Sequence, residues 1–218
     1  MRRSVLSRVQ RIKCGNVNIY IVSDNDSAIL IDTGKKEHLN TVIEACKPYQ
    51  IKLIVLTHAH LDHAENAAEL SQRFEAPVAM HKDDIDLIES NRNQDLSAKT
   101  FLGKMILSAT HKDFSKRKMS AFTPSVFLKD GDELIQYGIK AKVIGLPGHT
   151  KGSIGIDVNE KELIVGDALM NIFCPTVSLL YNDEKTMLDS AKKISRLEGR
   201  MIYFGHGKPV RNRMWVKE

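Results

Sequence analysis

Residues 57 to 63 read THAHLDH and directly follow the apolar run LIVL. Three histidines and one aspartate fall within six of these positions. In a strand, side chains two residues apart leave from the same side, so His58 and His60 should point the same way. Asp62 and His63 follow where a helix is expected to begin, so a turn there can place two pairs of ligands around one point. Because imidazole and carboxylate suit zinc and other first-row divalent metals, the segment predicts a metal site.

Three more candidate ligands follow apolar strands later in the chain. His149 lies in GLPGHTKGS, Asp167 in ELIVGD and His206 in MIYFGHG. Each stands next to a glycine, which lets the backbone turn sharply and lets a metal approach closely. Taken singly, each is also compatible with an ordinary turn or loop. Their shared placement predicts that the strand ends converge on one edge of the fold, where α/β proteins commonly place their sites.

Runs typical of strands alternate with helical patterns along both halves of the chain. Strands are predicted from β-branched content and flanking turn residues at 17–22, 28–32, 52–57, 77–81, 140–146, 153–158, 162–167 and 201–207. Helices are predicted from apolar spacing at 38–46, 63–74 and 185–197. Each half therefore indicates sheets covered by helices.

The stretch from Asp83 to Ser120 lacks the alternation of strands. Its segments DDIDLIES and LSAKTFLGKMILSATHK indicate helix. We expect a helical insertion, about 83–120, between the two halves of one domain that spans residues 1–218.

Composition narrows the class of protein. The 218 residues are 42% hydrophobic and 27% charged, as in ordinary soluble globular proteins. No apolar run is long enough for a membrane span, and the start MRRSVLSRVQRI lacks the apolar segment of a secretory signal. Three scattered cysteines favour reduced thiols and a cytoplasmic location. The formal charge of +5 is compatible with acidic substrates, nucleic acid or anionic lipid.

The segment HAHLDH resembles the HxHxDH signature of the metallo-β-lactamase-fold hydrolases. Four further motifs match that family in its order: IDTG with Asp32, GHTKGS with His149, GDAL with Asp167 and GHG with His206. The resemblance extends from about Val17 to Val210. It implies an α/β fold, an αββα four-layer sandwich of two similar halves with the helical insertion between them, and two metals at one edge.

The resemblance also implies a role for each motif residue. Asp32 would hold the metal-binding loops by hydrogen bonds, although it is also compatible with a plain turn before Gly34. The two ions are divalent, with zinc as the default and iron or manganese fitting the same nitrogen and oxygen donors. The resemblance implies that the first metal is held by His58, His60 and His149. It implies that the second is held by Asp62, His63 and His206, and that Asp167 contacts both.

A centre of this kind predicts hydrolysis. Two cations about 3.5–4 Å apart share a water and lower its pKa toward about 7, so that metal-bound hydroxide is available at neutral pH. Asp62 is the catalytic candidate, because it can orient that hydroxide. We expect a dinuclear metal-dependent hydrolase that attacks an ester-like bond, a thioester, lactone or related ester, in a small-molecule substrate.

Within the family, the chain resembles the glyoxalase II-like branch more than the true β-lactamases, since Asp167 occupies the bridging position and no signal peptide is identified. The C-terminal helical domain with which glyoxalase II enzymes bind glutathione is not identified either, which disfavours a glutathione thioester. Acyl-homoserine lactonases usually carry a tyrosine shortly after the bridging aspartate. Here ALMNIF follows it, which weakens the lactonase reading.

Three alternatives stay open. A metal-dependent phosphodiesterase or nuclease fits the basic insertion, but no β-CASP-like domain is identified, so nucleic acid is the less favoured partner. A mononuclear-iron persulfide dioxygenase keeps a similar motif. A non-catalytic metal-binding protein is disfavoured by the complete ligand set. No membrane partner is expected.

The insertion carries one further hypothesis. Loops between core strands of such sandwiches border the metals, so its apolar residues could form part of a substrate pocket. The alternative is that they pack the helices onto the core. The residues concerned are Phe101, Leu102, Met105 and Ile106.

Overall fold

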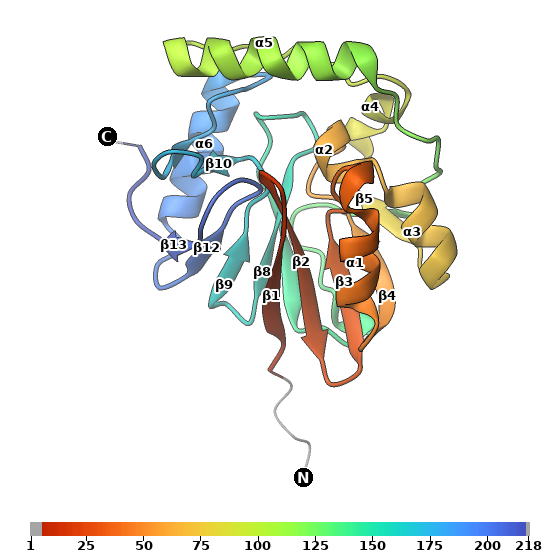
Figure 1. The fold of residues 1–218 in the computed structure, drawn as a ribbon. Helices are drawn as coiled ribbons and strands as arrows, with labels where there is room; N and C mark the ends of the chain where they lie inside the picture. Colours follow the sequence, from red (N-terminus) through yellow and green to blue (C-terminus); the bar gives the residue numbers. More distant parts are fainter. Residues whose placement is uncertain (1–5, 217–218) are drawn as a thin grey trace.

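The computed structural model describes residues 6–216 and contains two facing β-sheets with helices on their outer surfaces (Figure 1). The first sheet has the strand order β1-β2-β3-β4-β5-β6 and the second the order β13-β12-β9-β8-β7. The strands of the first sheet are β1 (Arg8–Cys14), β2 (Val17–Asp24), β3 (Ser27–Ile31), β4 (Gln50–Val55), β5 (Val78–Met80) and β6 (Val126–Phe127). Those of the second are β7 (Ala141–Gly145), β8 (Ile154–Val158), β9 (Glu162–Ile164), β12 (Met201–Tyr203) and β13 (Val210–Arg211).

The remaining elements are one short hairpin and the helices. The hairpin pairs β10 (Leu169–Met170) with β11 (Thr176–Val177). The α-helices are α1 (Leu39–Cys46), α2 (Leu61–Ala64), α3 (Ala67–Phe74), α4 (Asp86–Glu89), α5 (Phe101–Lys116) and α6 (Glu184–Ser195). Three single 3-10 turns are η1 (Lys36–His38), η2 (Lys82–Asp84) and η3 (Ile135–Tyr137).

Alternation along the central strands produces the layers. In β4, Leu53 and Val55 face the second sheet, whereas Ile54 packs toward α1 and α3. A third apolar cluster joins the outer face of the second sheet to Ala191 and Ile194 of α6. Because central strands such as β2, β3 and β8 bury both faces, the middle of each sheet is covered on both sides. The order of layers is α1 with α3, first sheet, second sheet and α6, which confirms the expected αββα sandwich (Figure 1).

The single helix predicted over 63–74 is wrong, because the structure has two helices there. Helix α2 ends at Ala64, and α3 begins at Ala67 after Asn66. The buried Asn66 amide donates to the carbonyls of Thr33, Gly34 and Lys35 at 2.9–3.1 Å. These long-range bonds hold the break in place, and they tie the helix pair to the loop after β3.

The stretch 83–120 is helical only in part. DDIDLIES contains the end of η2 and the single turn α4, and the chain then runs without a helix or named strand to Thr100. Asn91 explains the stop: its side chain accepts from Leu61 N at 2.6 Å and donates to the carbonyls of Ala59 and Leu87 at 2.9 and 2.8 Å. The segment is thereby anchored to the HAHLDH loop.

Helix α5 lies across one edge of the sandwich (Figure 1). Its C-terminal end is held by a 2.8 Å ion pair between Lys35 and Asp113, and by Arg117, which pairs with Glu37 and Glu65 at 2.7 and 3.1 Å. Its only buried residue is Gly103. The helix therefore covers the edge rather than forming part of the core. No helix within residues 6–216, α5 included, is long and apolar enough to cross a membrane.

Gly148 provides a test of how tightly the loop after β7 packs on α6. Its φ is +126°, and an added Cβ would collide with the backbone of Met187 in α6. We expect Gly148→Ala to lower the free energy of unfolding by at least about 2 kcal/mol, because it adds both strain and a clash. Gly199→Ala is the matched control, with φ +74° and open space around the added Cβ. Equal losses in urea unfolding would contradict the packing argument.

Candidate metal centre

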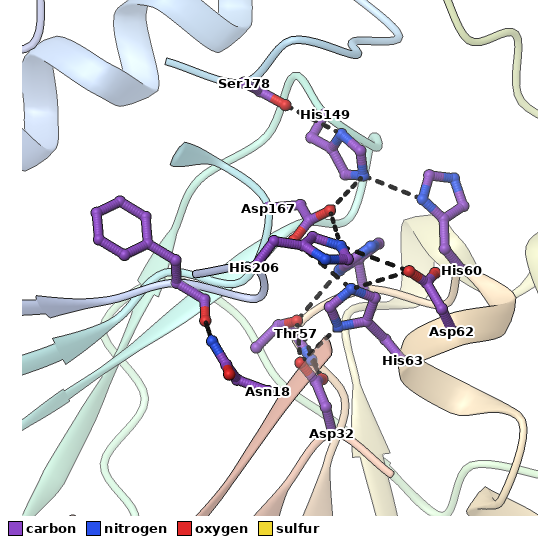
Figure 2. A network of polar contacts seen from close by, with 12 residues as sticks. Asn18, Asp32, Thr57, His60, Asp62, His63, His149, Asp167, Ser178 and His206 are labelled. Carbon is purple, nitrogen blue, oxygen red and sulfur yellow. Dashed lines mark hydrogen bonds and ion pairs between the residues drawn. The ribbon is translucent and has the colours of Figure 1, made fainter. Parts of the chain in front are cut away.

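The predicted ligands meet at one edge of the sandwich, where the strands of both sheets end. The HAHLDH loop follows β4 of the first sheet, and His149, Asp167 and His206 follow β7, β9 and β12 of the second. Figure 2 shows the side chains on these loops pointing toward one another from the two sheets. Residues almost 150 positions apart thus share one site, and the predicted convergence is confirmed.

The converging atoms form two groups, and a third set of His58, His63 and Asp167 joins them. His58, His60 and His149 each offer one ring nitrogen within 4.8 Å of the others, and His60 Nδ1 lies 3.0 Å from His149 Nε2. In the second group, Asp62 Oδ2 lies 3.8 Å from His63 Nε2 and 3.4 Å from His206 Nε2. Such spacings leave room for one cation within each group.

Asp167 stands between the two groups. Its Oδ1 lies 3.5 Å from His63 Nε2, and its Oδ2 lies 3.2 Å from His206 Nε2 and 3.8 Å from His149 Nε2. Gly205 makes this approach possible, since an added Cβ would meet Asp167 Oδ1 and the His63 ring. The carboxylate is therefore placed to contact an ion in either group.

The outer ring nitrogens are held by the surrounding backbone and side chains. Nδ1 of His149 donates to the Leu180 carbonyl at 2.8 Å, and Nδ1 of His206 donates to the Asn16 carbonyl at 2.8 Å. A carbonyl accepts only, so each Nδ1 carries a hydrogen, and Nε2 is the ring nitrogen that is left to bind a metal. His58 Nδ1 lies 3.1 Å from Thr57 Oγ1.

Asp32 links these loops to the end of β3. Its carboxylate accepts from Thr57 N at 2.7 Å and Thr57 Oγ1 at 2.9 Å, and Oδ2 lies 2.9 Å from His63 Nδ1 (Figure 2). The residue has a positive φ of 61° and is fully buried. These hydrogen bonds are of the kind that the sequence predicted for Asp32.

Several buried atoms at the centre have no partner among the described residues. They are His58 Nε2, His63 Nε2 and Asp167 Oδ1. A buried polar atom without a partner is costly, whereas coordination to a cation would satisfy all three. The donors are imidazole nitrogens and carboxylate oxygens, which zinc, iron and manganese accept. The residues therefore fit a metal centre.

Burial keeps three of the histidines neutral. It lowers the pKa of His60 to about 3, and it lowers the pKa values of His58 and His149 from their ordinary range. The neighbouring imidazoles add to the effect at His58 and His60. At neutral pH this group therefore offers unshared pairs without first losing a proton.

The second group is charged. Burial opposes the charged form of His63, but Asp62 and Asp167 outweigh it and raise the pKa of His63 to about 9. Burial likewise opposes ionisation of Asp167, yet His206 and His63 lower its pKa to about 2. The pKa of His206 is raised, and that of Asp62 is lowered, by the same opposite charges. Without a metal, protons on the histidines balance the two carboxylates.

Asp84 is a residue that the sequence analysis did not select. It is fully buried, and its carboxylate accepts from Thr150 Oγ1 and Gly152 N at 2.7 Å and from Ala59 N at 3.3 Å. It therefore joins the HAHLDH loop to the loop of His149. The available signal was its position after the strand PVAMH, the same strand-end placement that identified the ligands.

A cavity of about 640 Å³ opens onto the centre. His60, Asp62, His149, Asp167 and His206 form its floor, and one face of α5 forms a wall. Leu102, Met105 and Ile106 line that wall, as the pocket hypothesis required, whereas Phe101 is 81% exposed and does not line the cavity. The Phe114 ring lies 5.4 Å from the His60 ring, between centroids.

Comparisons with known proteins agree with this arrangement. The profile of the Metallo-beta-lactamase superfamily matches residues 12–206. Hydroxyacylglutathione hydrolase 1 of Vibrio vulnificus is 28% identical over 86% of this chain, which spans 61% of that longer relative. Hydroxyacylglutathione hydrolase GloC of Haemophilus influenzae is 28% identical over 86% of this chain and 83% of its own length. Among solved structures, the BLEG-1 B3 metallo-beta-lactamase superposes with a TM-score of 0.74 at 24% identity, covering 93% of each chain.

We predict that Asp84→Ala weakens metal binding about 10- to 100-fold, because the two ligand loops lose their shared acceptor. Metal content after dialysis against a chelator series would measure this loss. Asp83→Ala is the control, since Asp83 is the exposed neighbour on the same 3-10 turn. If both variants retained metal equally, Asp84 would have no part in holding the loops.

A second prediction concerns protons. At pH 7 the metal-free protein carries protons on His63 and His206, because their pKa values are raised. A cation must displace them, so binding should release protons and the apparent affinity should rise as pH increases from 6 toward 9. The rise is about tenfold per pH unit for each proton displaced. Titration calorimetry in buffers of different ionisation enthalpy measures the release, and a pH-independent affinity would contradict it.

Proposed function

The chain belongs to the Metallo-beta-lactamase superfamily, and from this premise we propose that it is a metal-dependent hydrolase of an ester-like bond in a small molecule. The observation that carries the proposal is the convergence of seven histidine and aspartate side chains. Three of them, His58, His63 and Asp167, each present a buried atom without a hydrogen-bond partner within residues 6–216. Relatives named hydroxyacylglutathione hydrolase and probable metallo-hydrolase support the reaction class.

The centre is proposed to be dinuclear. One ion is assigned to the group of His58, the other to the group of Asp62, and Asp167 is assigned to both because it contacts histidines of each. Zinc is the proposed metal, and iron and manganese fit the same donors. The full assignment is His58, His60 and His149 for the first ion, Asp62, His63 and His206 for the second, and Asp167 between them.

When bound, the ions supply a water of lowered pKa and polarise the substrate's carbonyl oxygen. The chain's own residues prepare that chemistry. Asp62 has a side chain 24% exposed, whereas those of His63 and Asp167 are 0% and 5% exposed, so Asp62 is the most exposed carboxylate at the centre. Its ionised carboxylate can accept a hydrogen bond from the attacking water and orient it. Asp32 fixes His63 from behind.

Among ester-like bonds we propose a thioester ahead of a lactone. The relatives named hydroxyacylglutathione hydrolase support this order. The segment ALMNIF after Asp167 contains no tyrosine of the kind that acyl-homoserine lactonases carry there. A cytoplasmic site of action is proposed as well, supported by the three free cysteines Cys14, Cys46 and Cys174.

The test is metal content combined with turnover. We expect two metal ions per chain and hydrolysis of an S-acyl thioester such as S-hexanoyl-N-acetylcysteamine. His58→Ala and Asp167→Ala should each lower kcat/KM about a thousandfold or more, since each removes a ligand from the charge-stabilising centre. His111→Ala is the control, because His111 is an exposed histidine of α5 that does not line the cavity.

Other outcomes would identify the alternatives. One iron per chain with oxygen consumption would indicate the persulfide dioxygenase. Cleavage of phosphodiesters in preference to thioesters would indicate the nuclease branch. Full metal occupancy without turnover of thioesters, lactones, phosphodiesters or β-lactams would leave a metal-binding protein.

A further inference from the structure

A second hollow of about 430 Å³ lies beside the metal centre. It shares Asn16, Ile172, Phe173 and His206 with the cavity over the metals, so the two spaces adjoin along this border. Its walls come from β1, the turn into β2, and the loops after β10 and β12. A molecule bound over the metals can therefore extend past His206 into this second space.

The second hollow is basic. Its lining includes the cations of Arg11, Lys13 and Lys208 and no carboxylate. We call this hollow the basic pocket. Arg11 and Lys13 are two apart on β1 and so face the same side of the strand. None of the three forms an ion pair with an acidic side chain in the part of the chain that the structure describes.

Arg11 is held in place within this pocket. Its guanidinium donates to the Gly207 carbonyl at 3.1 Å, next to His206. The other lining groups are polar: Asn16, Asn18 and Asn171. Asn18 donates to the carbonyls of Phe204 and Gly207 at 2.9 and 2.7 Å, and these bonds fix the backbone that lines the basic pocket. The positive side chains of Arg11, Lys13 and Lys208 have no acidic partner in the described part of the chain, and they line a hollow in the protein surface. Such an arrangement attracts anions.

The cavity over the centre differs on its α5 side. There the first half of α5 presents Leu102, Met105 and Ile106, at positions i, i+3 and i+4 of one helix face. Charged side chains of the second half of the helix, Lys112, Asp113 and Lys116, line the same cavity further along. The apolar face is not buried in the core, and Met105 is 58% exposed. The proposed scissile position thus lies near both an apolar stretch of α5 and the basic pocket.

We propose that the substrate joins an apolar group to an anionic one, and that its carboxylate or phosphate binds in the basic pocket. This proposal rests on the proposed hydrolase function. Water would add across the ester-like bond, and the products would be one carboxylic acid and one thiol or alcohol. Arg11 provides a planar fork that matches carboxylate and phosphate oxygens, and Lys13 and Lys208 add positive charge around it.

The kinetic test compares two thioesters with the same acyl group. S-hexanoyl-3-mercaptopropionate carries a carboxylate on the leaving group, and S-hexanoyl-N-acetylcysteamine carries none. We expect the metal-loaded enzyme to prefer the anionic thioester at least about tenfold in kcat/KM. The double variant K13E/K208E should abolish or reverse this preference, because the pocket would then repel the carboxylate.

The matched control is K140E/K161E, which lowers the net charge by the same amount. Lys140 and Lys161 are exposed and precede β7 and β9, whereas the site lies after those strands. This control should keep the preference of the wild type. Equal rates on both thioesters in the wild type, or equal losses of preference in both double variants, would overturn the proposal while leaving the hydrolase function intact.

A binding measurement separates the pocket from turnover. Succinate is titrated into the zinc-loaded full chain, and amide shifts are followed by NMR. We expect shifts that cluster at the turn after β1 and at residues 207–208, and that disappear in K13E/K208E. If neither thioester is cleaved but these shifts appear, the proposed thioesterase activity fails and the anion site stands. If these shifts are absent, or are the same in K13E/K208E, the basic pocket is not an anion site.

Discussion

The structure depends on one constraint: the ionisable side chains buried at the strand ends need polar partners on both their outer and their inner sides. On the outer side, Asp32, Thr57 and the carbonyls of Asn16 and Leu180 hold the histidine rings. On the inner side, atoms such as His58 Nε2 and Asp167 Oδ1 face one another without a protein partner. Desolvation makes such an arrangement costly unless a cation occupies the space between them. The same arrangement that strains the metal-free protein is therefore what fits it to hold metals.

The sandwich supplies the rigidity that this centre requires. Each of the two ligand groups combines residues of the segment after β4 with a histidine from a loop of the second sheet, so the centre spans both sheets. The apolar cluster between the sheets fixes their separation. Hydrogen bonds near the edge also hold the two sheets together. Asn18 of β2 donates to the Phe204 carbonyl, and Asp84 accepts from both Ala59 and Thr150. Small shifts of either sheet would change all the distances at once.

The surroundings of the centre bear on substrate choice more than the ligands do. Relatives with different names share the fold, so the reacting centre alone does not specify a molecule. In this chain α5 supplies an apolar wall, and β1 with the loop after β12 supplies cations. These elements lie outside the ligand motifs, and they are where closely similar folds can differ in the compounds that they accept.

The sequence by itself determined the strands, the main helices and the residues that gather at the edge, because strand periodicity, strand-end glycines and ligand chemistry are local properties. It missed β1, in which Arg11 and Lys13 alternate with the buried Ile12 and Cys14, and which forms a strand by pairing with β2. Only the tertiary structure decided the break at Asn66, the part played by Asp84, and which face of α5 meets the cavity. Each of these depends on partners 25 or more residues away, which no short window of sequence contains.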